Sequence, residues 1–253
     1  MQARIKGLVR KHTPRFLRRL AGRWYYPHVL RHFAESKWPC SDVVRRLVGP
    51  GDQVADVGAN IGYVTALLSR WVGPNGAVHS FEPVPDTYGW LSHNVKALGL
   101  GNVHTYDVGL SSEEREAWMV IPEYPSGGEN LYESRVAGDR DGADGARRVR
   151  VRLRTLDGVL SGGVSFIKID AEGHELPILR GARGIVSAFK PALLVEISGT
   201  PGENKELLAL LGSWGYGAYG WDGRTLSSRT PLGGGDWFFL QSGQLRRVGD
   251  LLG

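Results

Sequence analysis

The segment "KIDAEGHE", residues 168–175, concentrates ionisable side chains directly after a short apolar run. Carboxylates and imidazoles at such a place can orient an acceptor group and take its proton, which is general base chemistry. We expect Asp170, as the last residue of a strand, to face a cleft and to orient the acceptor or help remove its proton. His174, whose ordinary pKa lies near neutrality, is the second candidate base.

Further charged residues belong to this group of candidates. Acids favour the first turn of a helix because of the helix dipole, so Glu172 and Glu175 fit either a catalytic role or that local one. Lys168 stands in an otherwise apolar strand, which indicates a buried ion pair or a site residue. A pair with Glu196, at the end of the next strand, would explain both charges. The predicted catalytic set is Lys168, Asp170, Glu172, His174 and Glu196.

The same side chains raise the question of a metal ion. Oxygen and imidazole ligands from Asp170, Glu172, His174 and Glu196 would suit a divalent ion. Nothing in their spacing requires one, so we predict no metal site.

A glycine-rich turn, "VADVGANIGYVT" at residues 54–65, is the second motif that could do chemistry. Gly58 and Gly62 would let a ligand lie against bare backbone, where the first free N–H groups of a helix point at it. The dinucleotide fingerprint requires glycine where this sequence has Asn60. Asn60 therefore favours a ligand without a pyrophosphate, whose polar parts are an amino-acid end and a ribose.

Glu82, at "FEP" after the next strand, strengthens this interpretation. An acid here accepts hydrogen bonds from vicinal ribose hydroxyls in enzymes that use NAD or S-adenosylmethionine. For Thr65, a buried helix position is the alternative to contact with the amino-acid end. For Asp107, a turn cap is the alternative to contact with the adenine end. The expected cofactor-binding residues are Asp56, Gly58, Asn60, Gly62, Thr65, Glu82 and Asp107.

Strands that alternate with helices must position these residues. Expected strands are "QVADVG", "AVHSFEP", "NVHTYDV", "VSFIKID", "PALLVEIS", "YGAYGW" and "DWFFLQ". Expected helices are residues 41–48, 63–71, 85–98, "TLDGVL", "ELPILRGARGIVSAF" and residues 203–214. The alternation predicts an α/β fold whose parallel sheet is covered on both faces, with its site at the carboxyl ends of the strands.

The alternation stops at an insertion, residues 122–148, which is rich in Gly, Asp and Ser and lies between the short strands expected at "EAWMVI" and "RRVRVRLR". A long loop without apolar periodicity is either a lid over a site or a disordered segment. The sequence leaves both alternatives open.

Composition sets the remaining limits. The chain of 253 residues fits one large α/β domain, and its single cysteine, Cys40, excludes an intramolecular disulfide and a cysteine metal cage. No apolar run approaches membrane-spanning length and no secretory signal is recognisable, so we expect a cytoplasmic protein.

The amino-terminal end is strongly basic, because residues 1–23 contain eight Lys and Arg and no acid. Apolar residues recur there at helical spacing, which indicates a basic amphipathic helix on anionic lipid at the inner membrane face, or on an acidic partner or nucleic acid. The alternative is a helix that packs its apolar stripe on the domain. The aromatic cluster Trp24, Tyr25 and Tyr26 would line a sugar or hydrophobic acceptor, or pack against the sheet.

Several motifs resemble the FkbM-type family of S-adenosylmethionine-dependent methyltransferases. They are "DVGANIGYVT", "FEPVPDTYGWLSHNV", "TLDGVL", "FIKIDAEGHELPILRGA" and "PALLVEISG", in the family's order, and they cover about residues 50–200. The resemblance implies a class I methyltransferase fold, with a seven-stranded, mostly parallel sheet whose last strand is antiparallel. It also implies S-adenosylmethionine as cofactor and a hydroxyl of a sugar, glycolipid or natural product as acceptor.

The implied organisation is a methyltransferase domain at residues 50–253 that follows a basic and aromatic helical extension at residues 1–49. We expect that extension and the insertion to choose the substrate. Alternatives are an NAD-type oxidoreductase, against which Asn60 counts, and a non-catalytic S-adenosylmethionine-binding protein. A nucleic-acid methyltransferase is a third, although "AEGHE" after Asp170 replaces its usual NPPY-like tetrapeptide.

Overall fold

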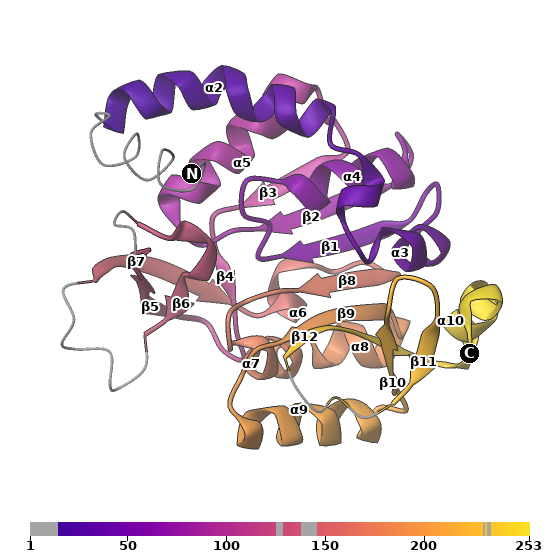
Figure 1. Ribbon diagram of the computed structural model, residues 1–253. Coiled ribbons are helices and arrows are strands. Elements are labelled where there is room, and N and C mark those ends of the chain that lie inside the picture. The colour runs from indigo at the N-terminus through magenta and orange to yellow at the C-terminus, as the bar shows by residue number, and fades with distance from the viewer. Residues whose placement is uncertain (1–14, 125–128, 138–145, 230, 232–233) are drawn as a thin grey trace.

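The computed structural model describes residues 15–124, 129–137, 146–229, 231 and 234–253 (Figure 1). The main strands are β1 (Gln53–Val57), β2 (Ala77–Phe81), β3 (Val103–Tyr106), β8 (Phe166–Ile169), β9 (Ala192–Ile197), β10 (Gly217–Trp221), β11 (Leu226–Ser228) and β12 (Gly235–Leu240). They form one sheet in the order β11-β10-β12-β9-β8-β1-β2-β3. The strands β1, β2, β3, β8 and β9 run parallel, and β12 lies antiparallel between β9 and β10.

This sheet confirms the predicted α/β class and the antiparallel last strand, but it has eight strands instead of seven. The additional strand is β11, in a segment whose composition indicates only turns. Leu226 is fully buried and pairs with Trp221 of β10. Pairing with β10 and burial of Leu226 therefore stabilise this strand, because strand formation depends on packing partners more than on local sequence.

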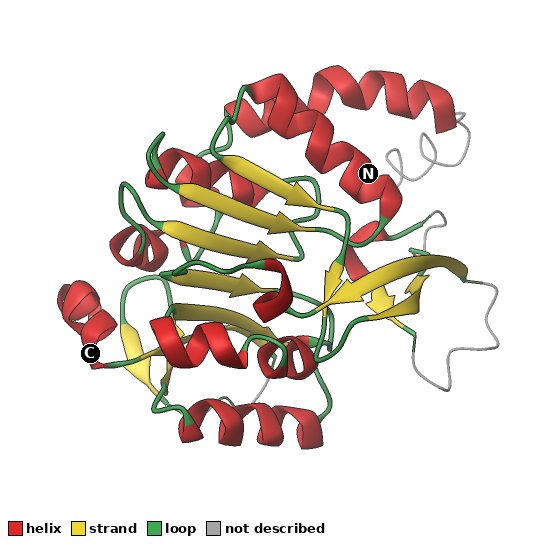
Figure 2. Cartoon of the chain, turned by 180° about the vertical axis from the view of Figure 1, so that it is seen from behind, coloured by secondary structure: helices red, strands yellow, loops and turns green. Residues whose placement is uncertain are grey.

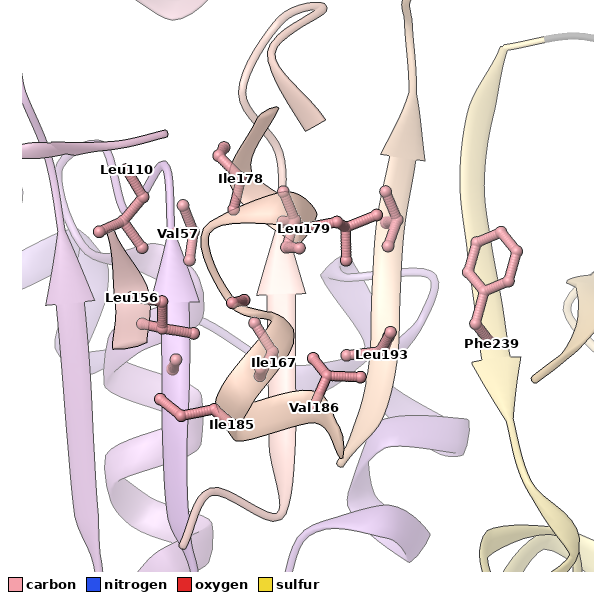
Figure 3. Packing of buried hydrophobic residues seen from close by; sticks show 14 of the residues in the cluster. Val57, Leu110, Leu156, Ile167, Ile178, Leu179, Ile185, Val186, Leu193 and Phe239 are labelled. Carbon is pink, nitrogen blue, oxygen red and sulfur yellow. The ribbon is translucent and has the colours of Figure 1, made fainter. Parts of the chain in front are cut away.

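Helices cover both faces of the sheet (Figure 2). They are α4 (Tyr63–Val72), α5 (Pro85–Leu98), α6 (Leu156–Val159), α7 (Glu175–Arg180), α8 (Arg183–Phe189) and α9 (Pro201–Ser213). The central strands read as continuous apolar runs because both of their faces are buried. On one face, residues of α6, α7 and α8 such as Leu156, Ile178 and Val186 pack on the strand residues Ile167 and Leu193 (Figure 3).

The helix predicted over residues 175–189 is wrong as one element, since α7 and α8 are separate. The break falls at Gly181, where a Cβ atom would lie 1.9 Å from the carbonyl oxygen of Ser111. Only glycine permits this approach of two backbone segments. The close contact therefore holds the helices against the segment that follows β4.

A small second sheet stands at the carboxyl edge of the main one. Its strands are β4 (Gly109–Leu110), β5 (Arg115–Ile121), β6 (Arg135–Val136) and β7 (Arg147–Arg154), in the order β4-β7-β5-β6. Met119, Ile121 and Leu153 belong to its own apolar cluster. Of the predicted insertion, residues 125–128 and 138–145 lie outside the described residues. The described remainder forms β6, the start of β7 and the short helix η2 (Leu131–Glu133).

The amino-terminal extension is helical where it is described, through α2 (Arg15–Arg31), η1 (Glu35–Lys37) and α3 (Ser41–Leu47). Val43 and Leu47 of α3 are buried in the core cluster that α4 also joins. The helix α2 packs on α5, with the rings of Tyr26 and Trp90 centred 5.1 Å apart. Trp24 is 86% exposed and Tyr25 61% exposed, so these two aromatic residues do not pack against the sheet.

The chain ends in α10 (Ser242–Leu245) and η3 (Arg246–Leu251). The latter returns to α3, where the guanidinium of Arg46 donates to the carboxylate of Asp250 at 2.8 Å. Among the helices of the described ranges, none has both the length and the apolarity that a membrane crossing requires. Residues 1–14, more than half of the predicted basic tail, lie outside the described residues.

Candidate active site

A cavity of about 400 Å³ lies where β1, β2 and β8 end, between the main sheet and the small sheet. One part is lined by the glycine-rich turn and by Glu82. Another part is lined by charged residues that lie in β8, directly after β8, in β9 and in β12. Apolar side chains from the small sheet, among them Met119, Val136 and Leu153, form a further wall. The two motifs predicted from the sequence thus meet in one cavity.

The glycine-rich turn has a backbone that few residue types adopt. Gly58, Asn60 and Gly62 have φ values of 76°, 50° and 98°. A Cβ atom at Gly58 would lie 1.9 Å from the carbonyl oxygen of Asp170, so this position requires glycine for both conformation and space. Asparagine tolerates the left-handed region, and the Asn60 side chain accepts a hydrogen bond from the N–H of Ile61 at 2.9 Å.

Glu82 is held by this turn and faces the cavity. Its two carboxylate oxygens accept hydrogen bonds from the backbone N–H groups of Asn60 and Val84, each at 3.0 Å. Burial raises the pKa of Glu82 to about 7, although these two hydrogen bonds favour its charged form. Each oxygen keeps a second lone pair, so the carboxylate can still accept from two ribose hydroxyls.

The surroundings of Glu82 fit a nucleoside. The cavity wall beside it is formed by the apolar residues Phe81, Pro83, Val84 and Val108, which suit a flat base. The bare backbone of Gly58 and the ribose-competent carboxylate of Glu82 therefore match the predicted cofactor.

Asp56 and Thr65, both predicted to bind the cofactor, lie behind the cavity and do not line it. Both are fully buried, and the Thr65 hydroxyl donates to the Asp56 carboxylate at 2.6 Å and lies 3.0 Å from the hydroxyl of Ser80. They tie β1, α4 and β2 together beneath the turn. The other oxygen of the Asp56 carboxylate has no hydrogen-bond partner among the described residues, and the Lys168 ammonium lies 3.8 Å from it. Contact of Asp56 and Thr65 with the cofactor stays a prediction.

Asp107 lies at the surface, and its contact with the adenine end of the cofactor stays a prediction. Its carboxylate accepts from the guanidinium of Arg152 in β7 at 2.7 Å, and its side chain is 58% exposed. It does not line the cavity. The pair links the segment after β3 to the outer face of the small sheet.

Lys168 is buried and is paired, but its partners are not the predicted Glu196. Its ammonium group donates to the Asp170 carboxylate at 2.9 Å and lies 3.8 Å from that of Asp56. Asp56 stands directly beside Lys168 in the β1–β8 register, which explains the choice. Burial opposes the charge of Lys168, but the two carboxylates outweigh it and raise its pKa, so the side chain stays protonated.

Asp170 and Glu196 form a carboxyl pair that shares a hydrogen bond. Burial alone would raise the pKa of Asp170, but the charge of Lys168 and the bond with Glu196 outweigh it and lower that pKa. The pKa of Glu196 is raised, first by the hydrogen bond with Asp170 and then by burial and the charge of Asp170. The pair therefore carries one proton near neutral pH, mainly on Glu196.

Glu172 joins this pair, since ligand atoms of Asp170, Glu172 and Glu196 all lie within 4.8 Å of one another. Its backbone is in the left-handed region, with φ 50°, and its pKa is raised by burial first and then by the charge of Asp170. Three oxygen donors at this spacing could hold a divalent ion. His174, the fourth ligand weighed from the sequence, is not part of this cluster of the described residues.

His174 lines the cavity and lies 3.0 Å, through its Nε2, from the hydroxyl of Ser111. Burial and the positive charge of Arg115 lower its pKa to about 4, so it is neutral at neutral pH and a weak base. Glu175 has the local role weighed for it. Its buried carboxylate accepts from the N–H groups of Ala171 and Gly173 and holds the loop.

Asp236 and Trp38 also line the cavity, and sequence reasoning missed them. Asp236 stands opposite Glu196 in the β9–β12 register, and its carboxylate accepts a hydrogen bond from the Cys40 thiol, with 3.5 Å between the atoms. An antiparallel neighbour for β9 is part of the predicted fold, so Asp236 could have been found from that register. Trp38 comes from the extension, and no motif marks it.

Comparison with known proteins finds similarity to methyltransferases. Residues 56–217 match the family model described as the methyltransferase FkbM domain. The chain is 25% identical over 179 residues to Methyltransferase 1 of Beauveria bassiana, covering 64% of this chain and 71% of that protein. It is 31% identical over 169 residues to hexuronic acid methyltransferase AglP of Haloferax volcanii, covering 62% of this chain and 61% of that protein.

A solved FkbM methyltransferase from Methylobacillus flagellatus KT is similar in fold, with a TM-score of 0.51 at 17% identity. The match covers 74% of this chain and 43% of that one. The chain therefore spans less than two thirds of this protein and of the Haloferax relative.

Proposed function

Because the chain belongs to the FkbM family of methyltransferases, we propose that it is an O-methyltransferase that modifies a hydroxyl group of an uncharged sugar, glycolipid or related natural product. The chain is a methyltransferase and its cofactor is S-adenosylmethionine. Membership of this methyltransferase family argues against the alternative of an NAD-type oxidoreductase. The observation that carries the finer proposal is the position of the Asp170–Glu196 pair in the cavity that the glycine-rich turn also lines.

The cofactor residues act by holding and orienting. S-adenosylmethionine, when bound, would supply a methyl group on its sulfonium sulfur, and transfer of that group to an acceptor oxygen would release S-adenosylhomocysteine as the leaving group. Gly58 provides bare backbone beside Asp170, and Glu82 supplies acceptors for ribose hydroxyls. Alignment of the two reactants is the main contribution that such a displacement needs from the protein.

Asp170 is the residue we assign to the acceptor hydroxyl. Its carboxylate takes one hydrogen bond from Lys168 and one from Glu196, and its side chain remains 37% exposed toward the cavity. It can accept the hydroxyl hydrogen bond and fix the direction of the oxygen lone pair. The proton released as the C–O bond forms passes to the carboxyl pair, which has room for a second proton.

The acceptor end of the cavity is rich in negative charge. Asp170, Glu172, Glu196 and Asp236 line it, and Lys168 is the basic residue among the described lining residues. Carboxylates accept hydrogen bonds from vicinal hydroxyls, whereas a carboxylate on the acceptor would meet like charges. Although the Haloferax relative is named for hexuronic acid, this chain is better suited to an uncharged polyol.

The test is release of S-adenosylhomocysteine by the purified protein, with neutral glycans and glycans that contain hexuronate as acceptors. Asp170→Asn should lower kcat by about 10²–10⁴ while cofactor affinity persists. Asp42→Asn is the matched control, because that carboxylate is exposed on α3 and does not line the cavity. Equal turnover of D170N and D42N would remove Asp170 from the reaction. Preference for hexuronate would overturn the proposed acceptor class.

A further inference from the structure

The charge of the chain is divided along its length. Residues 1–34 contain nine Lys and Arg and no acid, whereas residues 35–253 contain 22 Lys and Arg against 26 Asp and Glu. The positive net charge of the protein therefore comes entirely from its amino-terminal end. Such a concentration attracts an anionic surface.

The described part of this basic end is a helix with one face covered. Gly22, Pro27 and Leu30 of α2 are buried, and the Trp90 ring of α5 lies against Gly22, 2.6 Å from where a Cβ atom would stand. This face of α2 therefore packs on the domain, which is one of the two alternatives that the sequence leaves open.

The opposite face of α2 presents aromatic and basic side chains together. Trp24 and Tyr25 are 86% and 61% exposed, the two largest exposures among the large apolar residues of the described chain. His28 and Arg31, four and seven residues after Trp24 and therefore on its side of the helix, are also exposed. Tryptophan and tyrosine favour the boundary between lipid headgroups and acyl chains, and arginine favours anionic headgroups.

We propose that α2 docks the protein on an anionic lipid surface, with Trp24 and Tyr25 entering the headgroup region. A convex helix face suits a flat bilayer. Single-stranded nucleic acid instead lies in a basic groove with stacking aromatics, and neither Trp24 nor Tyr25 lines the cavity described above. Charge complementarity and exposed aromatics therefore favour lipid.

The docking face lies apart from the active site. Both views place α2 along one end of the molecule, with α5 between it and the main sheet (Figures 1 and 2). The docking itself is independent of the proposed O-methylation and is tested without turnover.

The experiment is co-sedimentation of the full chain with vesicles of phosphatidylcholine alone or mixed with phosphatidylglycerol. We expect binding only to the mixed vesicles, with loss of binding at about 1 M salt, where the Debye length is ~3 Å. The double variant Trp24→Ser and Tyr25→Ser should weaken binding by about tenfold or more. Phe189→Ser is the control, since Phe189 is 47% exposed on α8, outside the proposed docking face.

Three outcomes would overturn the proposal. One is that the unaltered protein does not sediment with anionic vesicles. Another is that the double variant binds as tightly as the control variant while all three proteins unfold at the same temperature. The last is that a single-stranded oligonucleotide binds with the same dependence on Trp24 and Tyr25 while the vesicles do not, which assigns this face to nucleic acid.

Discussion

Replacement of Gly58 by alanine measures how closely the cofactor turn and the catalytic strand are joined. The φ of Gly58 is 76°, and a non-glycine residue in the left-handed region costs about 1–2 kcal/mol. The added Cβ atom would also lie 1.9 Å from the carbonyl oxygen of Asp170. Because that neighbour is backbone, the turn or the end of β8 must move by more than ~1 Å, and overpacking of this kind costs about 1–3 kcal/mol.

The two costs add to about 2–5 kcal/mol of lost unfolding free energy. Gly99→Ala is the matched control. Gly99 follows α5 with φ 67°, and a Cβ atom there would meet nothing within 4 Å. This control therefore carries only the backbone cost, about 1–2 kcal/mol.

Thermal unfolding and turnover together decide the result. We expect Tm to fall by about 2–4 °C for each kcal/mol in a chain of this size, so G58A should melt below G99A. Turnover should fall by about 10²-fold only in G58A, because a displacement of ~1 Å misaligns the reactants. Equal stability and equal turnover of the two variants would refute the close contact between the turn and Asp170.

Three further predictions follow from buried groups. Burial raises the pKa of Glu82 to about 7, and hydrogen bonds from ribose hydroxyls favour its ionised form. The affinity for S-adenosylhomocysteine, measured by calorimetry, should therefore rise from about pH 6 to about pH 8. The same pH dependence in Glu82→Gln would contradict this prediction. Lys168→Met leaves the fully buried Asp56 without its cation and should lower the free energy of unfolding, measured in urea, by about 3–5 kcal/mol. The control Lys205→Met, at an exposed position, should lower it by about 0.5 kcal/mol or less. Burial, followed by the charge of Asp236, raises the pKa of the Cys40 thiol, so a thiol reagent should modify it only after unfolding, and rapid reaction of the folded protein would show that the thiol is accessible.

A chelator tests whether the acidic cluster in the cavity holds a metal ion. Asp170, Glu172 and Glu196 offer three oxygen donors, yet Lys168 and the proton held mainly by Glu196 already offset part of their charge. We expect full activity of the purified protein in a chelator. Loss of activity in the chelator, restored by one divalent ion, would show that the cluster holds a metal.

Local sequence was sufficient for many elements. The helix predicted over residues 85–98 is α5, and Gly99 ends it in the left-handed conformation that such a cap requires. The central strands were predicted because burial on both faces leaves a continuous apolar run. Each of these signals lies within the element that it describes.

Side-chain partners were harder to predict, because they depend on register between segments far apart in sequence. Lys168 was assigned to Glu196, but the β1–β8 register places Asp56 beside it. Strand alternation turns Asp56 toward Thr65 of α4, behind the cavity, an arrangement that the motif alone does not reveal. The break at Gly181 depends on the backbone of Ser111, which the helical pattern cannot reveal.

The small sheet is attached to the fold at adjoining points. Its chain enters at β4 and leaves at the end of β7, and these two strands pair directly, Gly109 with Leu153 and Leu110 with Arg154. Between them the sheet has its own apolar cluster and supplies one wall of the cavity. Insertions with neighbouring ends can lengthen, shorten or be exchanged without strain on the host. Apart from Ser111, whose backbone packs on Gly181, residues 109–154 can therefore diverge as one unit, so that the acceptor can change while the cofactor turn stays constant.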